Sequence, residues 1–256
     1  MDFGQAMQFD LTDDGFLDGR LRILQPKAGY RAATDPVLLA AFAPAEPGQS
    51  VLELGCGTGV ASLCLGYRVK GLALTGVERQ SSYAYLARKN ADRNAAVLHV
   101  VEADLAALPP TISAESFDHA LANPPYFRAG GGTAANDVGK EGAFREQTPL
   151  SQWIDTSLRR LRPGGWLTMI HLAERLDDIL ADLRGRTGSV EILPVAPRSG
   201  RPATRVLVRA RKVDRGPLTL LPPLVLHDGP EHLRDGDDYS MAARSVLREG
   251  VALPIR

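Results

Sequence analysis

Between residues 50 and 184, short β-rich runs alternate with helical patterns, and this alternation limits the folds open to the chain more than any other feature. The runs that predict strands are 50–54, 73–77, 97–101, 118–122, 165–171, 190–195 and 204–211. The patterns typical of helices are 59–69, 80–93, 149–161 and 174–184. Strands that alternate with helices in this way predict a parallel sheet with helices on both faces.

The last two predicted strands depart from this pattern because only "PRSGRPA" separates them, too little for a helix. We therefore expect them to pair antiparallel, as strands joined by a short connection do. The predicted fold class is α/β, with a mixed seven-stranded sheet and helices on both faces. It is the Rossmann-like arrangement in which ligands bind at the carboxyl ends of the strands.

The two ends of the chain differ from this central pattern. In "FLDGRLRILQ", residues 16–25, an Asp-Gly pair between apolar residues predicts a β-hairpin. In "TDPVLLAAFAP", we expect Asp35 to cap a helix whose first residue is Pro36. The predicted organisation is an N-terminal hairpin and helix extension (1–48), a core (49–213) and a C-terminal extension packed on the core (214–256).

Composition restricts the possible partners. Hydrophobic residues make up 44% of the chain and charged residues 23%, as in ordinary soluble globular proteins. The 30 basic and 30 acidic residues cancel, so a site for a polyanion must be a local patch. Cys56 and Cys64 form neither a disulfide framework nor a metal-ligand set, which favours the cytoplasm. No run reaches transmembrane length, and we expect neither a membrane nor a metal as a partner.

The stretch "VLELGCGTGV", residues 51–60, predicts a strand that leads through a glycine-rich loop into a helix. Glycines at such a strand end let the backbone approach a ligand. A dinucleotide-binding loop needs glycine where this chain has Val60, which disfavours a dehydrogenase. The acid Glu53 near the loop suits an amine-bearing or cationic ligand better than a pyrophosphate. The pattern resembles motif I of S-adenosylmethionine-dependent methyltransferases, and the predicted cofactor contacts here are Glu53, Gly55, Cys56, Gly57 and Gly59.

Two more acids stand where the next predicted strands end. Glu78 lies nineteen residues beyond Gly59, a position suited to accepting hydrogen bonds from ribose hydroxyls. Asp104 follows the third strand, where methyltransferases of this fold hold the adenine amino group. Acids at successive strand ends predict a binding site for S-adenosyl-L-methionine.

The stretch "NPPY" follows the fourth predicted strand, beside the same expected cleft. The exocyclic amine of adenine is a poor nucleophile because its lone pair is delocalised into the ring. Two acceptors that hold its N–H groups favour the pyramidal form and free the lone pair. The side-chain oxygen of Asn123 and the carbonyl of Pro124 are the predicted acceptors, oriented before reaction by the prolines. Tyr126 offers a ring on which an extruded base can stack.

Together with the loop, "LDGRLRILQPKAGYRAATDPVLLAA" and "NPPYF" resemble the tRNA1(Val) adenine-37 N6-methyltransferase family over residues 14–213. The resemblance implies a Rossmann-like class I methyltransferase fold and an adenosine in the tRNA anticodon loop as substrate. Thr34 and Asp35 match the block that commonly touches the methionine part of the cofactor in that family, and Asn123 is placed beside the same cofactor.

Other substrates remain open at this point. "NPPY" also occurs in enzymes that methylate protein glutamine, and the same chemistry serves rRNA or DNA. Glutamine-modifying relatives carry a long helical N-terminal domain, whereas here about fifty residues with a hairpin precede the glycine loop. A catalytically silent RNA-binding protein of this fold is the alternative from another class.

The region 198–215 is locally basic. Alternation along "TRVLVRAR" predicts that Arg205, Arg209 and Arg211 share one face of a strand. They form either a patch that follows the phosphates of tRNA or a solvated face paired with surface acids. In the first interpretation the glycine-rich segment 129–142 closes over the flipped nucleotide.

Overall fold

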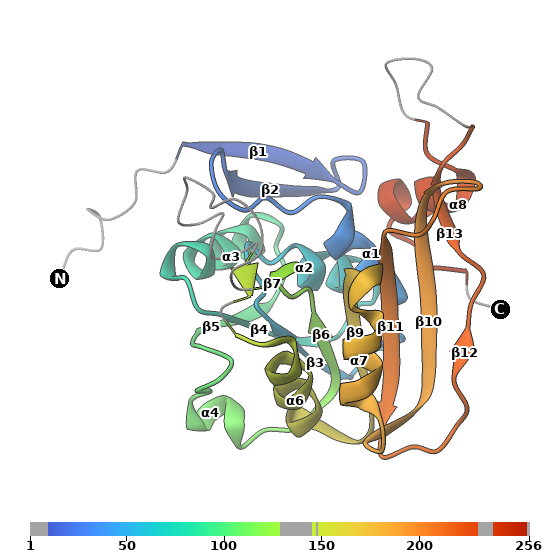
Figure 1. Ribbon diagram of the computed structural model, residues 1–256. Helices are drawn as coiled ribbons and strands as arrows, with labels where there is room; N and C mark the ends of the chain where they lie inside the picture. Colours follow the sequence, from blue (N-terminus) through green and yellow to red (C-terminus); the bar gives the residue numbers. More distant parts are fainter. Residues whose placement is uncertain (1–9, 129–144, 147, 230–237, 255–256) are drawn as a thin grey trace.

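The centre of the protein is a mixed β-sheet, whose strands lie side by side across the computed structural model in Figure 1. The structure describes residues 10–128, 145–146, 148–229 and 238–254. Within them, eight strands follow the order β12–β10–β11–β9–β6–β3–β4–β5, and β13 also pairs with β10. Their bounds are β3 Ser50–Leu54, β4 Ala73–Glu78, β5 Leu98–Glu102, β6 Phe117–Ala122, β9 Leu161–Leu172, β10 Thr187–Arg198, β11 Arg205–Lys212, β12 Thr219–Leu220 and β13 Leu224–His227.

The pairing confirms the predicted mixed sheet. Strands β3, β4, β5, β6 and β9 all run parallel to one another, whereas β11 is antiparallel to both β9 and β10. The structure adds β12 and β13, both parallel to β10, to the seven strands expected from the sequence. These two strands are short and lie in the proline-rich stretch 217–227, where the periodic signal of a strand is weak.

Helices cover both faces of the sheet, as expected. On one face lie α1 (Thr34–Phe42), α2 (Val60–Arg68) and α3 (Ser81–Arg93), and on the other lie α4 (Pro110–Ser113), α6 (Leu150–Arg160) and α7 (Leu176–Leu183). The smaller elements are the hairpin β1 (Leu11–Phe16) and β2 (Leu21–Pro26), the pair β7 (Phe127–Arg128) and β8 (Arg145–Glu146), and the helical turns η2 (Ala173–Arg175), α8 (Met241–Arg244) and η3 (Ser245–Glu249).

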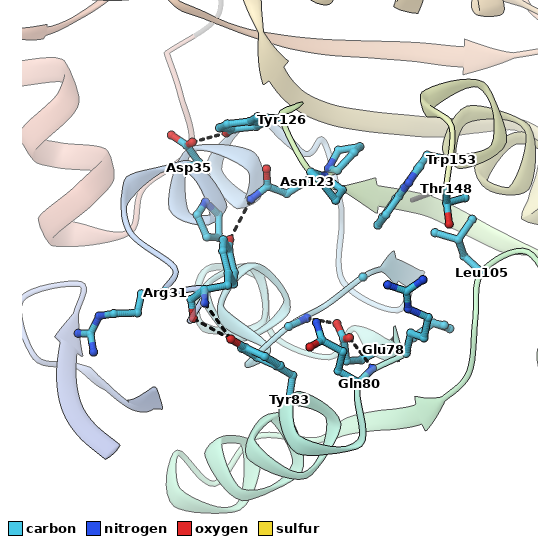
Figure 2. Close-up of a pocket in the computed structure, with 18 of the residues that line it drawn as sticks. Arg31, Asp35, Glu78, Gln80, Tyr83, Leu105, Asn123, Tyr126, Thr148 and Trp153 are labelled. Atoms are coloured by element: carbon cyan, nitrogen blue, oxygen red, sulfur yellow. Dashed lines mark hydrogen bonds between the residues drawn. The ribbon is translucent and has the colours of Figure 1, made fainter. Parts of the chain in front are cut away.

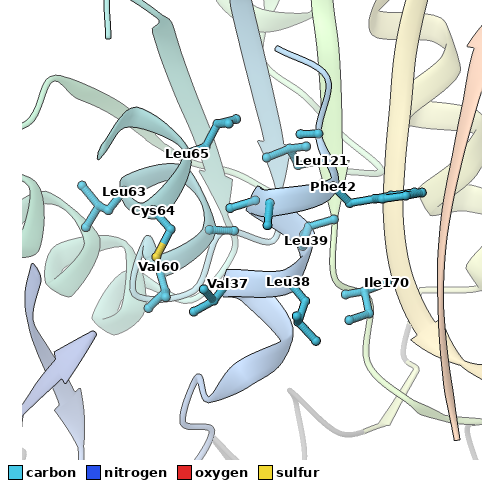
Figure 3. Packing of buried hydrophobic residues seen from close by; sticks show 14 of the residues in the cluster. Val37, Leu38, Leu39, Phe42, Val60, Leu63, Cys64, Leu65, Leu121 and Ile170 are labelled. Atoms are coloured by element: carbon cyan, nitrogen blue, oxygen red, sulfur yellow. The ribbon is translucent and has the colours of Figure 1, made fainter. Parts of the chain in front are cut away.

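The central strands β3 and β6 send side chains into two separate hydrophobic cores on opposite faces of the sheet. On β3, Val51 packs with α1 and α2, while Leu52 and Leu54 pack with α6 on the opposite face. On β6, Leu121 likewise belongs to the α1–α2 core shown in Figure 3. This two-residue period is the geometric consequence of the pleated strand. It explains why the strands read as continuous apolar runs, since both of their faces are buried.

The N-terminal hairpin has the turn that the Asp-Gly pair predicts. Asp18 and Gly19 both have positive φ, 57° and 79°, which a tight hairpin turn requires. The hairpin is fastened to α3 by Asn90, whose side chain accepts from Leu24 N at 2.8 Å and donates to Leu24 O at 3.1 Å. The hairpin thus caps the glycine-loop side of the sheet.

The predicted helix cap at Asp35 is wrong. Helix α1 begins at Thr34, its N-cap position is Ala33, and Pro36 is the third helical residue. The carboxylate of Asp35 instead binds the Tyr126 hydroxyl and the Arg205 guanidinium. A side chain with two distant partners is not available to the backbone of its own helix.

Of the three arginines of β11 predicted to form a phosphate-binding patch, Arg209 is held within the protein, whereas contact of Arg205 and Arg211 with phosphates stays a prediction. Arg209 is 14% exposed, binds Glu191 at 2.6 Å and 3.0 Å, and lies between the rings of Phe42 and Trp166. Arg205 is paired with Asp35, and Arg211 donates to Gly164 O at 2.9 Å. The prediction is therefore wrong for Arg209, which serves the packing of α1 on the sheet.

The C-terminal residues contact the core, in keeping with the division into 1–48, 49–213 and 214–256, which stays a prediction. Val246 is buried in the α1–α2 core, and Leu253 N donates to Ala41 O at 3.0 Å. The segment 129–142, expected to close over a nucleotide, falls within 129–144, outside the described residues. No helix in the described part of the chain is long and apolar enough to cross a membrane.

Replacing Arg209 with alanine should destabilise the protein because Glu191 would be left as a half-buried, unpaired carboxylate. We expect the free energy of unfolding to fall by about 2 kcal/mol or more, measured by urea denaturation. Arg211→Ala is the matched control on the same strand and face, and its exposed side chain should cost about 0.5 kcal/mol or less. Equal effects of the two substitutions would contradict a structural role specific to Arg209.

Candidate functional site

A cleft of about 220 Å³ opens where the carboxyl ends of β3, β4 and β6 meet the N-terminus of α1 (Figure 2). Its walls contain nine of the residues predicted from the sequence: Thr34, Asp35, Gly55, Gly57, Glu78, Asp104, Asn123, Pro124 and Tyr126. Residues far apart in the sequence thus meet at one edge of the sheet, as parallel strands require. The cleft is the candidate functional site.

Three predicted residues, Glu53, Cys56 and Gly59, do not line the cleft. Glu53 is 4% exposed and accepts hydrogen bonds from the backbone and hydroxyl of Ser62, in the first turn of α2. Burial raises its pKa to about 7. The Cys56 thiol is buried against Gly76, where an added Cβ would lie 2.7 Å from Sγ. These residues support the loop from behind; their direct contact with a cofactor stays a prediction.

The glycine loop needs glycine for two reasons. Gly55, Gly57 and Gly59 have φ values of 64°, 55° and 86°, a region that other residues rarely adopt. At Gly55 a Cβ would also lie 2.5 Å from the ring of Trp153 on α6. At Gly59, the N-cap of α2, it would press on Leu98 at 3.2 Å. The loop therefore presents its backbone, and no side chain at Gly55 or Gly57, to the cleft.

Glu78 ties this loop to the end of β4. One carboxylate oxygen accepts from Gly57 N at 2.9 Å, and the other accepts from Gln80 N at 2.8 Å. The side chain is buried, and this burial raises the pKa of the carboxyl above its usual value. Each carboxylate oxygen has a second lone pair, so Glu78 retains capacity to accept from a ligand hydroxyl in the cleft.

Asp104 lies on the same side of the cleft but is more exposed. Its Oδ1 accepts from Ala106 N at 2.8 Å, and its Oδ2 lies 3.8 Å from the Arg79 guanidinium. The first contact is a local turn that fixes the side chain after β5. Its second oxygen lies toward Arg79, which also lines the cleft.

Asn123 and Tyr126 follow the end of β6 and form the wall of the cleft opposite Glu78 and Asp104. The strand ends at Ala122, before the two prolines, as predicted. The Asn123 amide donates to the hydroxyl of Tyr30 at 3.3 Å, and the Tyr126 hydroxyl donates to Asp35. Burial and the adjacent Asp35 carboxylate raise the pKa of Tyr126, so its hydroxyl remains a donor.

Several residues of the cleft were not predicted from the sequence. Tyr30, Tyr83 and Trp153 line the cleft, and His171 on β9 supports the Tyr126 ring, with ring centroids 5.3 Å apart. The signal for Tyr30 was present, because it stands in the "GYRAATD" block four residues before Thr34. Trp153 and His171 are isolated residues in a helix and a strand, where aromatic side chains ordinarily pack in the core. Among the described residues, no group of three His, Cys, Asp or Glu side chains could hold a metal ion.

Two known enzymes are similar to almost the whole chain. The tRNA1(Val) (adenine(37)-N6)-methyltransferase of Porphyromonas gingivalis is 29% identical, over 94% of this chain and 100% of that protein. The enzyme of the same name from Dickeya chrysanthemi is 27% identical, over 93% of this chain and 94% of its own.

Solved structures agree with the fold. A predicted O-methyltransferase from Agrobacterium tumefaciens has a TM-score of 0.69 and 28% identity, over 87% of this chain and 99% of that one. A tRNA (m1A58) methyltransferase from Aquifex aeolicus, 14% identical with a TM-score of 0.52, covers 74% of this chain and 72% of its own and shares the fold alone.

The sequence pattern of the family described as the methyltransferase small domain matches residues 32–191. The matched range runs from the residue before the α1 N-cap into β10. It contains every predicted catalytic and cofactor-binding residue, whereas the predicted basic patch on β11 lies outside it. By this match over more than half of its length, the chain belongs to the methyltransferase small-domain family.

Proposed function

We propose that this protein transfers a methyl group from S-adenosylmethionine to the N6 amine of an adenosine in the anticodon loop of tRNA. The observation that carries the proposal is the meeting of Asn123, Pro124 and Tyr126 with the glycine loop and Glu78 in one cleft. The named activity of two relatives, similar over most of the chain, supports the same substrate.

The cleft fits the cofactor by its shape and by its hydrogen-bond acceptors. Gly55 and Gly57 expose their backbone to the cleft, since neither has a side chain and both have a positive φ that other residues rarely adopt. Glu78 is placed to accept from the ribose hydroxyls, and Asp104 from the adenine amino group. Thr34 and Asp35 stand beside the expected position of the methionine end. When bound, the cofactor supplies a methyl group carried on a sulfonium sulfur.

Asn123 and Pro124 would act on the target amine. The Asn123 side-chain oxygen and the Pro124 carbonyl each accept one N–H of N6, which favours a pyramidal nitrogen whose lone pair points away from the ring. That lone pair would accept the methyl group that the bound cofactor supplies, and the cofactor would leave as a thioether. The methylated nitrogen is then strongly acidic and loses one proton to water. The rate gain comes from orientation fixed before reaction, because the prolines hold the carbonyl in place.

Tyr126 would hold the base. Its ring is anchored by the Asp35 bond and by contact with His171, so the face available to a base is fixed. A base reaches this cleft only outside its stack, which suits the unpaired nucleotides of a loop. Arg31, Arg79 and Arg205 bring cations to the same cleft and are the candidates for contacting the RNA backbone. A tRNA substrate and two buried free thiols favour a cytoplasmic protein.

The same amine chemistry on rRNA, DNA or a protein glutamine is the alternative function. The name of the Agrobacterium protein refers to a hydroxyl acceptor. A hydroxyl has one proton to donate, whereas Asn123 and Pro124 offer two acceptors, which matches an NH₂ group.

Replacing Glu78 with alanine should weaken cofactor binding, because it removes a charge-assisted hydrogen bond and a support of the glycine loop. We expect a loss of about 1.5–3 kcal/mol by isothermal titration calorimetry. Glu102→Ala is the matched control, since Glu102 stands opposite Glu78 on β5 but lies outside the cleft and binds Ser81. Unchanged affinity in Glu78→Ala, or an equal loss in Glu102→Ala, would remove Glu78 from the site.

Replacing Asn123 with alanine should lower kcat by about 100-fold or more while cofactor affinity stays within a few-fold. The reason is that an acceptor used mainly in the transition state affects turnover rather than ground-state binding. Single-turnover transfer of labelled methyl groups measures the first quantity and calorimetry the second. Near-normal turnover would contradict the role of Asn123 as an acceptor for the amine.

The substrate is tested by methyl transfer from labelled cofactor to tRNA-Val transcripts with adenosine or guanosine at position 37. We expect label only in the adenosine transcript and in N6-methyladenosine on nucleoside analysis, because the cleft accepts one unpaired base. Duplex DNA, an rRNA fragment and a release factor are the competing substrates. If one of these competitors is labelled and neither tRNA transcript is, the tRNA substrate is wrong. The methylation of an amine would then apply to that competitor.

A further inference from the structure

Tyr30 lines the cleft from the segment that connects the N-terminal hairpin to α1. Its hydroxyl accepts a hydrogen bond from the side-chain amide of Asn123 at the cleft wall. The bond runs from Asn123 Nδ2 to the Tyr30 oxygen at 3.3 Å and links positions 93 residues apart. Neither the glycine loop nor the NPPY motif includes Tyr30.

This bond decides which end of the Asn123 amide faces the substrate. A side-chain amide has an oxygen that accepts and an NH₂ group that donates, on opposite sides of one carbon. With Nδ2 turned to Tyr30, Oδ1 is left to accept from an incoming amine. An amide turned by 180° would present its NH₂ group to the target NH₂ group, and two donors repel.

Tyr30 is itself held firmly. Its backbone N donates to the Tyr83 hydroxyl at 2.9 Å, and that hydroxyl donates to Tyr30 O at 3.2 Å. The two rings lie 6.5 Å apart at 52°, and the Tyr30 ring passes over Gly57, which has no side chain to displace it. The rotamer of Tyr30 is thus fixed by packing on both sides.

The charges around Tyr30 keep its hydroxyl protonated. Burial and the nearby carboxylates of Asp35, Glu53 and Glu78, together with Tyr83, raise its pKa above the usual value. A phenol in that state keeps both its donor and its lone pairs at neutral pH, so it can accept from Asn123 throughout the working range.

We propose that Tyr30 is a positioning residue, which orients the Asn123 amide so that Oδ1 faces the amine to be methylated. The proposal rests on the proposed function and adds to it the group that selects the reactive orientation of Asn123. It concerns turnover and not affinity, because Tyr30 acts through Asn123 rather than on the methyl donor.

The test is Tyr30→Phe, which keeps the ring and removes only the hydroxyl. We expect kcat to fall by about tenfold, with the KM for tRNA and the cofactor Kd each within about twofold. Tyr67→Phe is the matched control, because Tyr67 is a partly buried tyrosine on α2 that does not line the cleft. A kcat within about twofold of wild type, or a loss carried by KM or Kd instead, would overturn the proposal.

A second measurement needs no activity and no variant that might unfold. In the wild-type protein, the Asn123 side-chain NH₂ protons should exchange slowly with water and show nuclear Overhauser contacts to the Tyr30 ring. Fast exchange and no such contacts would overturn the proposal even if tRNA is methylated. If no substrate is methylated, the proposed function fails, and the NMR result alone decides the orientation of the amide.

Discussion

A parallel sheet brings the carboxyl ends of its strands to one edge, and the candidate site of this protein depends on that constraint. Strands β3, β4, β5 and β6 run in the same direction, so the residues that follow them converge although the chain separates them widely. Gly55, Glu78, Asp104 and Asn123 each come from a different strand end and line one cleft. The backbone hydrogen bonds that pair these strands therefore bring the residues of the site together.

The carboxylate of Asp35 joins this edge to the rest of the molecule. It binds Tyr126 from the loop after β6 and Arg205 from β11, while Asp35 itself lies in the first turn of α1. Three segments are therefore locked around one carboxylate in a partly buried position, where a charge-assisted bond is stronger than at the surface. The same interaction holds the Arg205 guanidinium at the wall of the cleft. It also fixes the Tyr126 ring against His171, so the support of this ring reaches across three strands of the sheet.

Two buried acids show how the glycine loop is supported from both sides. Glu53 accepts from the first turn of α2 behind the loop, whereas Glu78 accepts from Gly57 within it. Burial raises the pKa of both carboxyls. The hydrogen bonds from backbone N–H groups oppose that shift, since they favour the charged form. The two acids therefore differ in position. Glu53 supports the helix behind the loop, whereas Glu78 supports the loop and also lines the cleft.

The sequence predicted a mixed α/β sheet, without the short strands β12 and β13, and nine of the residues that line the cleft. Two-residue and 3.6-residue periods are local, and Gly55, Glu78 and "NPPY" were found because strand ends in this fold are functional positions. Tertiary structure alone decided the direction of side chains. Glu53 turned to α2, Arg209 turned inward to Glu191, and Asp35 bound Tyr126 instead of capping its helix. Likewise, Tyr30 and Trp153 entered the cleft only through long-range packing. The reason is that the hydrophobic period of a strand or helix indicates which face a residue occupies. The partner of its side chain depends instead on segments far away in the sequence.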